Sequence, residues 1–194
     1  MLYDVLKFFH IIGFAFMSIP LFNLIVVNER VLMGKSVIPS VDRYMESIIR
    51  HGAVRCYVFQ STVLVTGFLL IISGPLGIEA LWKIWIVPVK VALLFTLMGL
   101  LSYVNFGIQP KIDFLIDGVG PDAAPSEEFM NQLRPLRVLR KRLAAICLFL
   151  VIASIVLGLQ VYSLFNPLIT AALIFLGGVF ALRAHKSLVR FGWF

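Results

Sequence analysis

Two polar side chains, His10 and Lys90, stand inside long apolar stretches of this sequence, where a polar group is rare and costly. The neutral imidazole of a histidine is a good ligand for haem iron or for copper. The ammonium group of a lysine is a counter-ion for an anionic ligand, such as a porphyrin propionate, a quinone oxygen or a lipid phosphate. This pair of residue types therefore favours a site for a redox cofactor.

Each of the two residues also has a purely structural interpretation. His10 can hydrogen-bond to a neighbouring helix or to interfacial water, and the long stem of Lys90 can reach past Trp85 to the headgroups. An unpaired ammonium at the centre of a bilayer costs about 2.5–3.5 kcal/mol on insertion scales. Lys90 therefore needs either a ligand or a side-chain conformation that reaches the headgroups. The residues alone leave both interpretations open.

The neighbours of His10 limit what it can bind. Gly13 shares a helical face with His10 and would leave room for a flat macrocycle against the backbone. Met17 is on the same face but about 10.5 Å of helical rise away, so it cannot join His10 on one iron. The other two histidines, His51 and His185, are predicted at the opposite surface of the membrane. A second axial ligand would therefore be a lysine, a methionine, a water or a group from another subunit.

Gln160 is predicted at the same depth as His10 and Lys90. We therefore expect a cofactor site lined by His10, Gly13, Lys90 and Gln160, with His10 as the metal ligand. Haem b is the expected cofactor, and a quinone is the alternative. No catalytic residue is indicated, and whether the protein is an enzyme stays open.

Composition decides which elements position these residues. Of the 194 residues 60% are hydrophobic and only 14% are charged, whereas soluble domains carry about 25% charged residues. A soluble fold of this length has too much surface to hide so many apolar side chains. The chain is therefore predicted to be an all-α membrane protein, since helices satisfy their own backbone in lipid.

Five apolar stretches are long enough to cross about 30 Å of hydrocarbon. We place them near residues 5–27, 56–78, 83–106, 143–163 and 168–184 of a single transmembrane domain, 1–194. Four are expected to form a helical bundle, to which the fifth is appended. Most of the 17 Lys and Arg residues fall in the connections after spans 1 and 3 and in the C-terminal tail. The positive-inside rule then predicts the N-terminus outside and the C-terminus inside.

The two basic connections are predicted to hold helices that lie in the membrane interface. They cover about residues 41–55 and 127–141, and each leads into the following span. The basic cluster at residues 137–142 is interpreted as a topology signal that contacts anionic lipid, in preference to a protein-docking site. Three polar residues of the inner half are expected to hydrogen-bond between helices as structural glue: Asn23, Gln60 and Asn105.

Short motifs in spans 1 to 4 resemble a family of small bacterial membrane proteins. The stretch Leu6-Lys7-Phe8-Phe9-His10-Ile11-Ile12-Gly13, the pair Thr66-Gly67 and the position of Lys90 are similar to the HemJ-type protoporphyrinogen oxidases and the CopD-type copper-resistance proteins. The resemblance implies a four-helix core with an added fifth span, a haem-ligating His10 and an active-site cation at Lys90. Leu21 and Phe22 stand where the HemJ type has an arginine, which favours a relative with another role.

Three functions follow from these observations. The first is binding of haem b or a quinone in the outer half of the bilayer, as a subunit of an electron-transfer complex. The second is a cofactor-free structural subunit, and the third a copper-handling protein or a HemJ-like oxidase. The expected location is the bacterial inner membrane, with lipids and other membrane subunits, or a second copy, as partners. Nucleic acid is not an expected partner, because the basic residues flank apolar spans.

Overall fold

The protein is almost entirely helical, without strands, in the part described by the computed structural model, which comprises residues 1–33, 39–75, 77–120, 126–161 and 166–186. Five continuous helical segments are long and apolar enough to cross a membrane. They contain α1 (Leu2–Met33), α2 (Pro39–Ser73), α4 (Ile86–Ser102), α6 (Glu127–Leu159) and α7 (Pro167–Lys186). The prediction of an all-α membrane protein with five spans is thereby confirmed.

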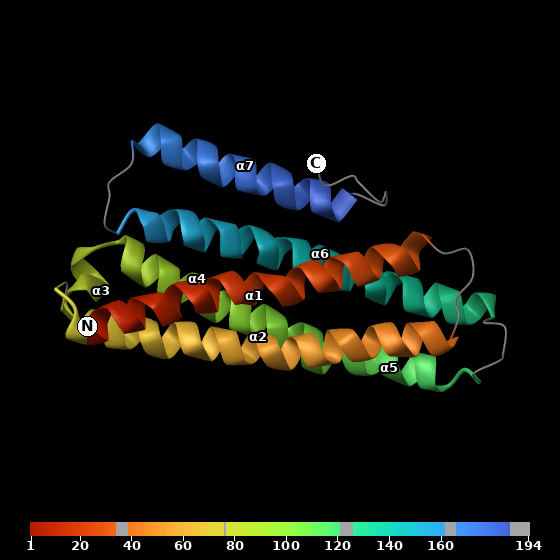
Figure 1. The fold of residues 1–194 in the computed structure, drawn as a ribbon. Coiled ribbons are helices and arrows are strands. Elements are labelled where there is room, and N and C mark those ends of the chain that lie inside the picture. Colours follow the sequence, from red (N-terminus) through yellow and green to blue (C-terminus); the bar gives the residue numbers. More distant parts are fainter. Residues whose placement is uncertain (34–38, 76, 121–125, 162–165, 187–194) are drawn as a thin grey trace.

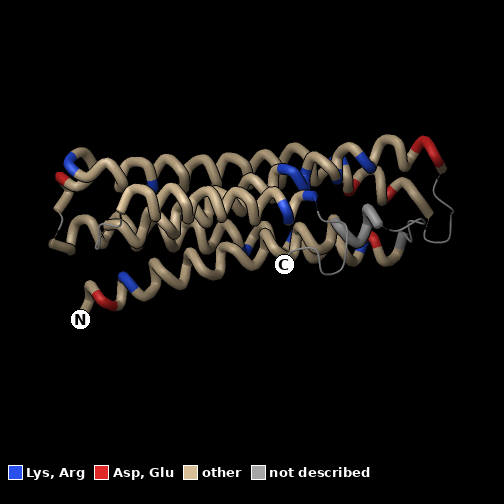
Figure 2. The backbone as a smooth tube through the Cα atoms, turned by 90° about the horizontal axis from the view of Figure 1, so that it is seen from above, with Lys and Arg blue, Asp and Glu red and all other residues tan. Residues whose placement is uncertain are grey.

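The helices run side by side along one axis (Figure 1). The start of α1, the short helix α3 (Ala80–Lys83), the end of α6 and the start of α7 lie at one end, which we call the N-terminal end. The end of α1 and the starts of α2 and α6 lie at the other end. Lys, Arg, Asp and Glu gather in the half nearer this second end (Figure 2), which we call the charged end.

Helix α7 packs along α6 at the edge of the bundle (Figure 1). The remaining spans pack against one another in the pairs α1–α2, α1–α6, α2–α4 and α4–α6. Small residues permit the close approach of α7, since a methyl group added at Gly177 would lie 2.7 Å from the Ile152 side chain of α6. This arrangement is a four-helix bundle with a fifth helix on its outside.

The segments predicted as interfacial helices are instead straight extensions of the spans. Residues 41–55 belong to α2 and residues 127–141 to α6, and both helices are unbroken. Each is about 50 Å long at 1.5 Å per residue, well beyond the thickness of the hydrocarbon layer. Their charged side chains meet inside the bundle, where Asp42 and Glu46 of α2 pair with Arg137 and Arg140 of α6. Their position relative to the membrane interface stays a prediction.

The third span is also longer than its predicted limits, 83–106. A π-helical turn, η1 (Tyr103–Ile108), joins α4 to α5 (Gln109–Asp117), and the three form one rod. Beyond the turn, Ile112 and Ile116 of α5 pack against Phe129 and Leu133 of α6. This apolar cluster lets α5 continue as a packed helix at the charged end.

Candidate functional site

His10 of α1 is held by hydrogen bonds to α2. Its Nδ1 atom lies 3.1 Å from the carbonyl oxygen of Val63 and 3.1 Å from Oγ1 of Thr66. The Thr66 hydroxyl donates to the carbonyl of Thr62 at 2.6 Å, so both groups facing Nδ1 act as acceptors. In the neutral ring this network assigns the proton to Nδ1 and leaves the lone pair on Nε2. Metal-ligating histidines are commonly oriented in this way.

The imidazole ring fits against α2 because residue 67 is a glycine. A Cβ atom at Gly67 would lie 3.0 Å from Cε1 of His10 and 3.4 Å from its Nδ1. Ordinary contacts between heavy atoms of this kind are about 3.5–4.0 Å. A side chain at this position would therefore push the ring away from Val63 and Thr66.

Lys90 of α4 extends toward α6 and α1. A Cβ atom at Gly158 would lie 3.0 Å from the ammonium nitrogen, which therefore rests against bare α6 backbone. The same nitrogen is 5.6 Å from the centroid of the Phe14 ring, within the range of a cation–π interaction. The ion pairs found among the described residues do not include Lys90.

Phe14 joins the two residues into one site, which we call the His10–Lys90 site. Its ring meets the His10 ring edge-on, with 5.4 Å between centroids and an interplanar angle of 72°. The ammonium of Lys90 lies over the same phenyl ring. His10 and Lys90 are both partly exposed, whereas Phe14 is buried. The structure thus brings an imidazole and an ammonium together, with one face open to the surroundings of the bundle.

The two other residues predicted to line the cofactor site have different surroundings. A Cβ atom at Gly13 would lie 2.8 Å from the Val63 side chain, so α2 fills the space that we expected for a macrocycle. Gln160 is buried, and its amide donates to the hydroxyl of Thr170 on α7. Gly13 therefore serves the contact between α1 and α2, and Gln160 links α6 to α7.

A second polar site, which the sequence analysis did not foresee, lies at the charged end. Arg140 of α6 donates from both terminal nitrogens to the carboxylate of Glu46 on α2, at 2.5 and 3.1 Å. Arg137 donates to Asp42 at 2.8 Å and to Oε1 of Glu46 at 3.0 Å, the oxygen that also accepts from Nη2 of Arg140. All four side chains are buried, Arg140 completely. Arg140 and Glu46 thus form a buried, bidentate ion pair, which is a strong form of charge-assisted hydrogen bonding.

Two further helices complete this site. Arg140 donates to the Asn28 side chain of α1 at 2.9 Å and to the Gln109 side chain of α5 at 2.7 Å. Gln109 in turn donates to Glu46 at 2.9 Å and to Asp113 at 3.0 Å. We call the set Asn28, Asp42, Glu46, Gln109, Arg137 and Arg140 the ionic network. It ties together α1, α2, α5 and α6.

The ionic network corrects our interpretation of the basic cluster at residues 137–142. Arg137, Arg140 and Lys141 are buried inside the bundle and do not face lipid headgroups, whereas Arg142 is exposed. A signal was present in the sequence. Asp42 and Glu46 are four residues apart, and Arg137 and Arg140 are three apart, so each pair lies on one helical face.

The three polar residues that we predicted to hydrogen-bond between helices do not form such a layer. Asn23 is exposed on the outside of the bundle, and the side-chain oxygen of Gln60 has no hydrogen-bond partner among the described residues. The hydrogen bond that joins α2 to α4 runs instead from Tyr57 to Ser102, at 2.9 Å. Depth alone did not show which way each polar side chain points around its helix.

Comparisons with known proteins add no family. A scan of protein-family models, of curated proteins and of solved structures finds no match to this chain. Within the described residues, no group of three or more His, Cys, Asp and Glu side chains is placed to hold a metal ion. The resemblance to the HemJ and CopD types thus stays a prediction. Function must be argued from the two polar sites.

Proposed function

We propose that this multi-pass membrane protein binds an anionic redox cofactor of the haem b type at the His10–Lys90 site. The observation that carries the proposal is the shared contact with Phe14, which places a ring nitrogen with a free lone pair close to an ammonium group. His10 would bind the metal through Nε2, and Lys90 would neutralise a carboxylate of the cofactor. A quinone is the alternative occupant, with the Lys90 ammonium as the hydrogen-bond donor to a quinone oxygen.

The donor set fits such a cofactor in three respects. The acceptors at Nδ1 orient the imidazole, and the glycine behind it leaves the ring undisturbed. Lys90 has no carboxylate partner among the described residues, so its charge is available to a ligand. The partial exposure of His10 and Lys90 gives a ligand access from the surroundings of the bundle. The cofactor itself supplies the electron-transfer chemistry, and the protein's part is to hold and orient it.

The place of this site in the membrane follows from the positive-inside rule. With the charged end in the cytoplasm, the His10–Lys90 site falls in the outer half of a bacterial inner membrane. A cofactor at that depth would exchange electrons with another membrane subunit, so we place the protein in an electron-transfer complex.

The test is an absorption spectrum and a pyridine haemochrome assay on gently solubilised protein with its partners retained. We expect a Soret band that His10→Ala abolishes and that the matched control His51→Ala leaves intact, because His51 is exposed and its Nδ1 bonds to Ser47 of its own helix. Lys90→Met is expected to weaken cofactor retention, and Lys83→Met, at an exposed ion pair with Glu79, is not. A Soret band that survives His10→Ala would overturn the assignment of the ligand.

One set of observations favours a second candidate, the cofactor-free structural subunit. Val63 fills the space beside Gly13, and the carboxylates of the ionic network find their guanidinium partners within this chain. A protein of this kind would offer its apolar surface to partner helices, with α7 at the edge of the bundle. Absence of both haem and quinone from the purified complex, with assembly unchanged in the double variant His10→Ala/Lys90→Met, would favour this candidate.

A further inference from the structure

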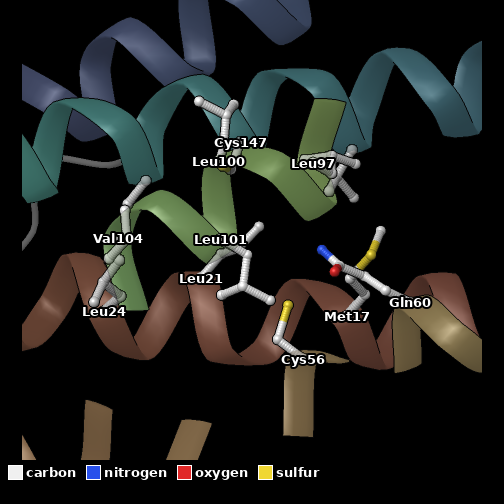
Figure 3. A pocket seen from close by; sticks show the side chains of 12 residues that line it. Met17, Leu21, Leu24, Cys56, Gln60, Leu97, Leu100, Leu101, Val104 and Cys147 are labelled. Carbon is white, nitrogen blue, oxygen red and sulfur yellow. The ribbon is translucent and has the colours of Figure 1, made fainter. Parts of the chain in front are cut away.

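A cavity of about 40 Å³ lies inside the bundle, where α1, α2, α4 and α6 meet (Figure 3). Its walls are mostly leucine and valine side chains, with five residues of another kind: Met17, Cys56, Gln60, Ala144 and Cys147. Met17 comes from α1, Cys56 and Gln60 from α2, and Cys147 from α6. The cavity is far below the roughly 300–1,000 Å³ of typical small-molecule pockets, so it is not a haem site.

Gln60 is the feature of this cavity that an apolar core does not explain. Its side chain is 1% exposed, and its amide points into the pocket (Figure 3). The amide oxygen accepts no hydrogen bond from the described residues. Burying such a group without a partner is unfavourable, because the hydrogen bond that it made to water is lost on folding. A polar molecule in the cavity would remove this cost.

The size of the cavity suits water, and Gln60 is the strongly polar side chain in an otherwise apolar lining. A bound water needs about 10–15 Å³ of such space, so the cavity has room for about two or three molecules. Beside the Gln60 amide, the thiols of Cys56 and Cys147 supply weak donors and acceptors. Ordered buried water typically makes about three hydrogen bonds to otherwise unsatisfied groups.

The cavity also lies between the two polar sites of the molecule. At its outer limit, Met17 is three residues along α1 from Phe14, which contacts both His10 and Lys90. At its inner limit, Leu24 is four residues from Asn28 of the ionic network. About one turn of helix therefore separates the cavity from each site.

We propose that this cavity is a water-binding site anchored by the side-chain amide of Gln60. The bound water donates a hydrogen bond to the amide oxygen. It also provides a polar group midway between the ionic network and the His10–Lys90 site. This inference does not depend on a cofactor, because it uses only the cavity and the residues that line it.

Radiolytic footprinting of the intact protein tests the proposal directly. Short X-ray pulses convert bound water into hydroxyl radicals, which oxidise the nearest sulfur side chains. Met17, Cys56 and Cys147 are 0%, 3% and 6% exposed, so radicals from bulk solvent do not reach them. We expect oxidation of Met17 to the sulfoxide in the native protein, carrying ¹⁸O after equilibration in H₂¹⁸O.

The decisive variant is Gln60→Leu, with Gln60→Met as a second replacement of similar length. Oxidation of Met17 should fall by about tenfold, because the radical source is lost with the bound water. An unfolded variant would expose Met17 and raise its labelling, so a fall cannot come from misfolding. Ser154→Ala is the matched control, since Ser154 is buried and bonds to Leu150 of its own helix. No oxidation of Met17 in the native protein, or equal oxidation in both folded variants, would overturn the proposal.

Discussion

The two polar sites of this protein are built in opposite ways. In the ionic network, each buried carboxylate faces a buried guanidinium, and four helices supply the groups. In the His10–Lys90 site, a cation rests against a phenyl ring and a glycine, and both polar residues stay partly exposed. The first site pairs both of its carboxylates with guanidinium groups of this chain, whereas the second leaves one charge for something outside it. Two buried nitrogens of Arg137, Nε and Nη1, have no hydrogen-bond partner among the described residues.

This difference separates stability from function. A buried network of paired charges holds helices in register, and removal of one partner leaves an uncompensated charge. A polar site in a membrane whose charge has no partner lowers the stability of the fold, and polar residues of this kind usually belong to a binding site. The comparison therefore predicts that the two sites respond differently to the same kind of substitution.

The largest effect is expected at the ionic network. Arg140→Ala would leave Glu46 buried beside only one guanidinium and would remove the bonds to Asn28 and Gln109. We expect the free energy of unfolding to fall by about 3–5 kcal/mol, as for other broken buried ion pairs. Denaturant titration in detergent micelles measures it, with exposed Arg142→Ala as the control. Equal effects of the two substitutions would contradict the network's structural role.

A smaller effect is expected where glycine makes room for the imidazole. Gly67→Ala would place a methyl group 3.0 Å from Cε1 of His10, and the ring cannot move without losing Val63 and Thr66. Overpacking of this kind costs about 1–3 kcal/mol. Gly158→Ala creates the same distance to the end of the flexible Lys90 side chain and should cost less. The melting temperatures of the two variants measure this order, and a reversed order would show that His10 is not rigidly held.

The smallest effect, and of opposite sign, is expected at Lys90. Lys90→Met keeps the length of the side chain and removes an ammonium that has no carboxylate partner among the residues described. We expect the cofactor-free protein to gain up to about 1 kcal/mol of stability, since an unpaired charge in this layer is unfavourable. Denaturant titration of cofactor-free preparations is the measurement. A clear loss of stability would mean that Lys90 has a structural partner after all.

Much of the fold was predictable because lipid makes apolar length decisive. Each of the five predicted spans lies largely within one of the long helical segments, including the short last span near residues 168–184. The limits at the charged end were not predictable in the same way. The apolar stretch of a sequence ends where the helix leaves the hydrocarbon layer. Helices α2, α5 and α6 continue beyond this point because they pack on one another.

The candidate site was predictable in part for the same reason. His10 and Lys90 are conspicuous in apolar stretches, and helical rise placed them at a common depth. Rise gives no information on rotation about the helix axis. The sequence therefore did not predict that Gly13 faces Val63, that Gln160 faces Thr170, or that Asn23 points out of the bundle.

The sequence by itself determined that this chain is a bundle of membrane-crossing helices carrying an imidazole and an ammonium in apolar surroundings. Its apolar content leaves no soluble alternative, and a helix is the simplest way to satisfy the backbone of one span in lipid. Only the tertiary structure decided the partners. Arg140 and Glu46 are 94 residues apart, and His10 and Val63 are 53 apart. Such contacts depend on how whole helices rotate and pack, which no local pattern of residues contains.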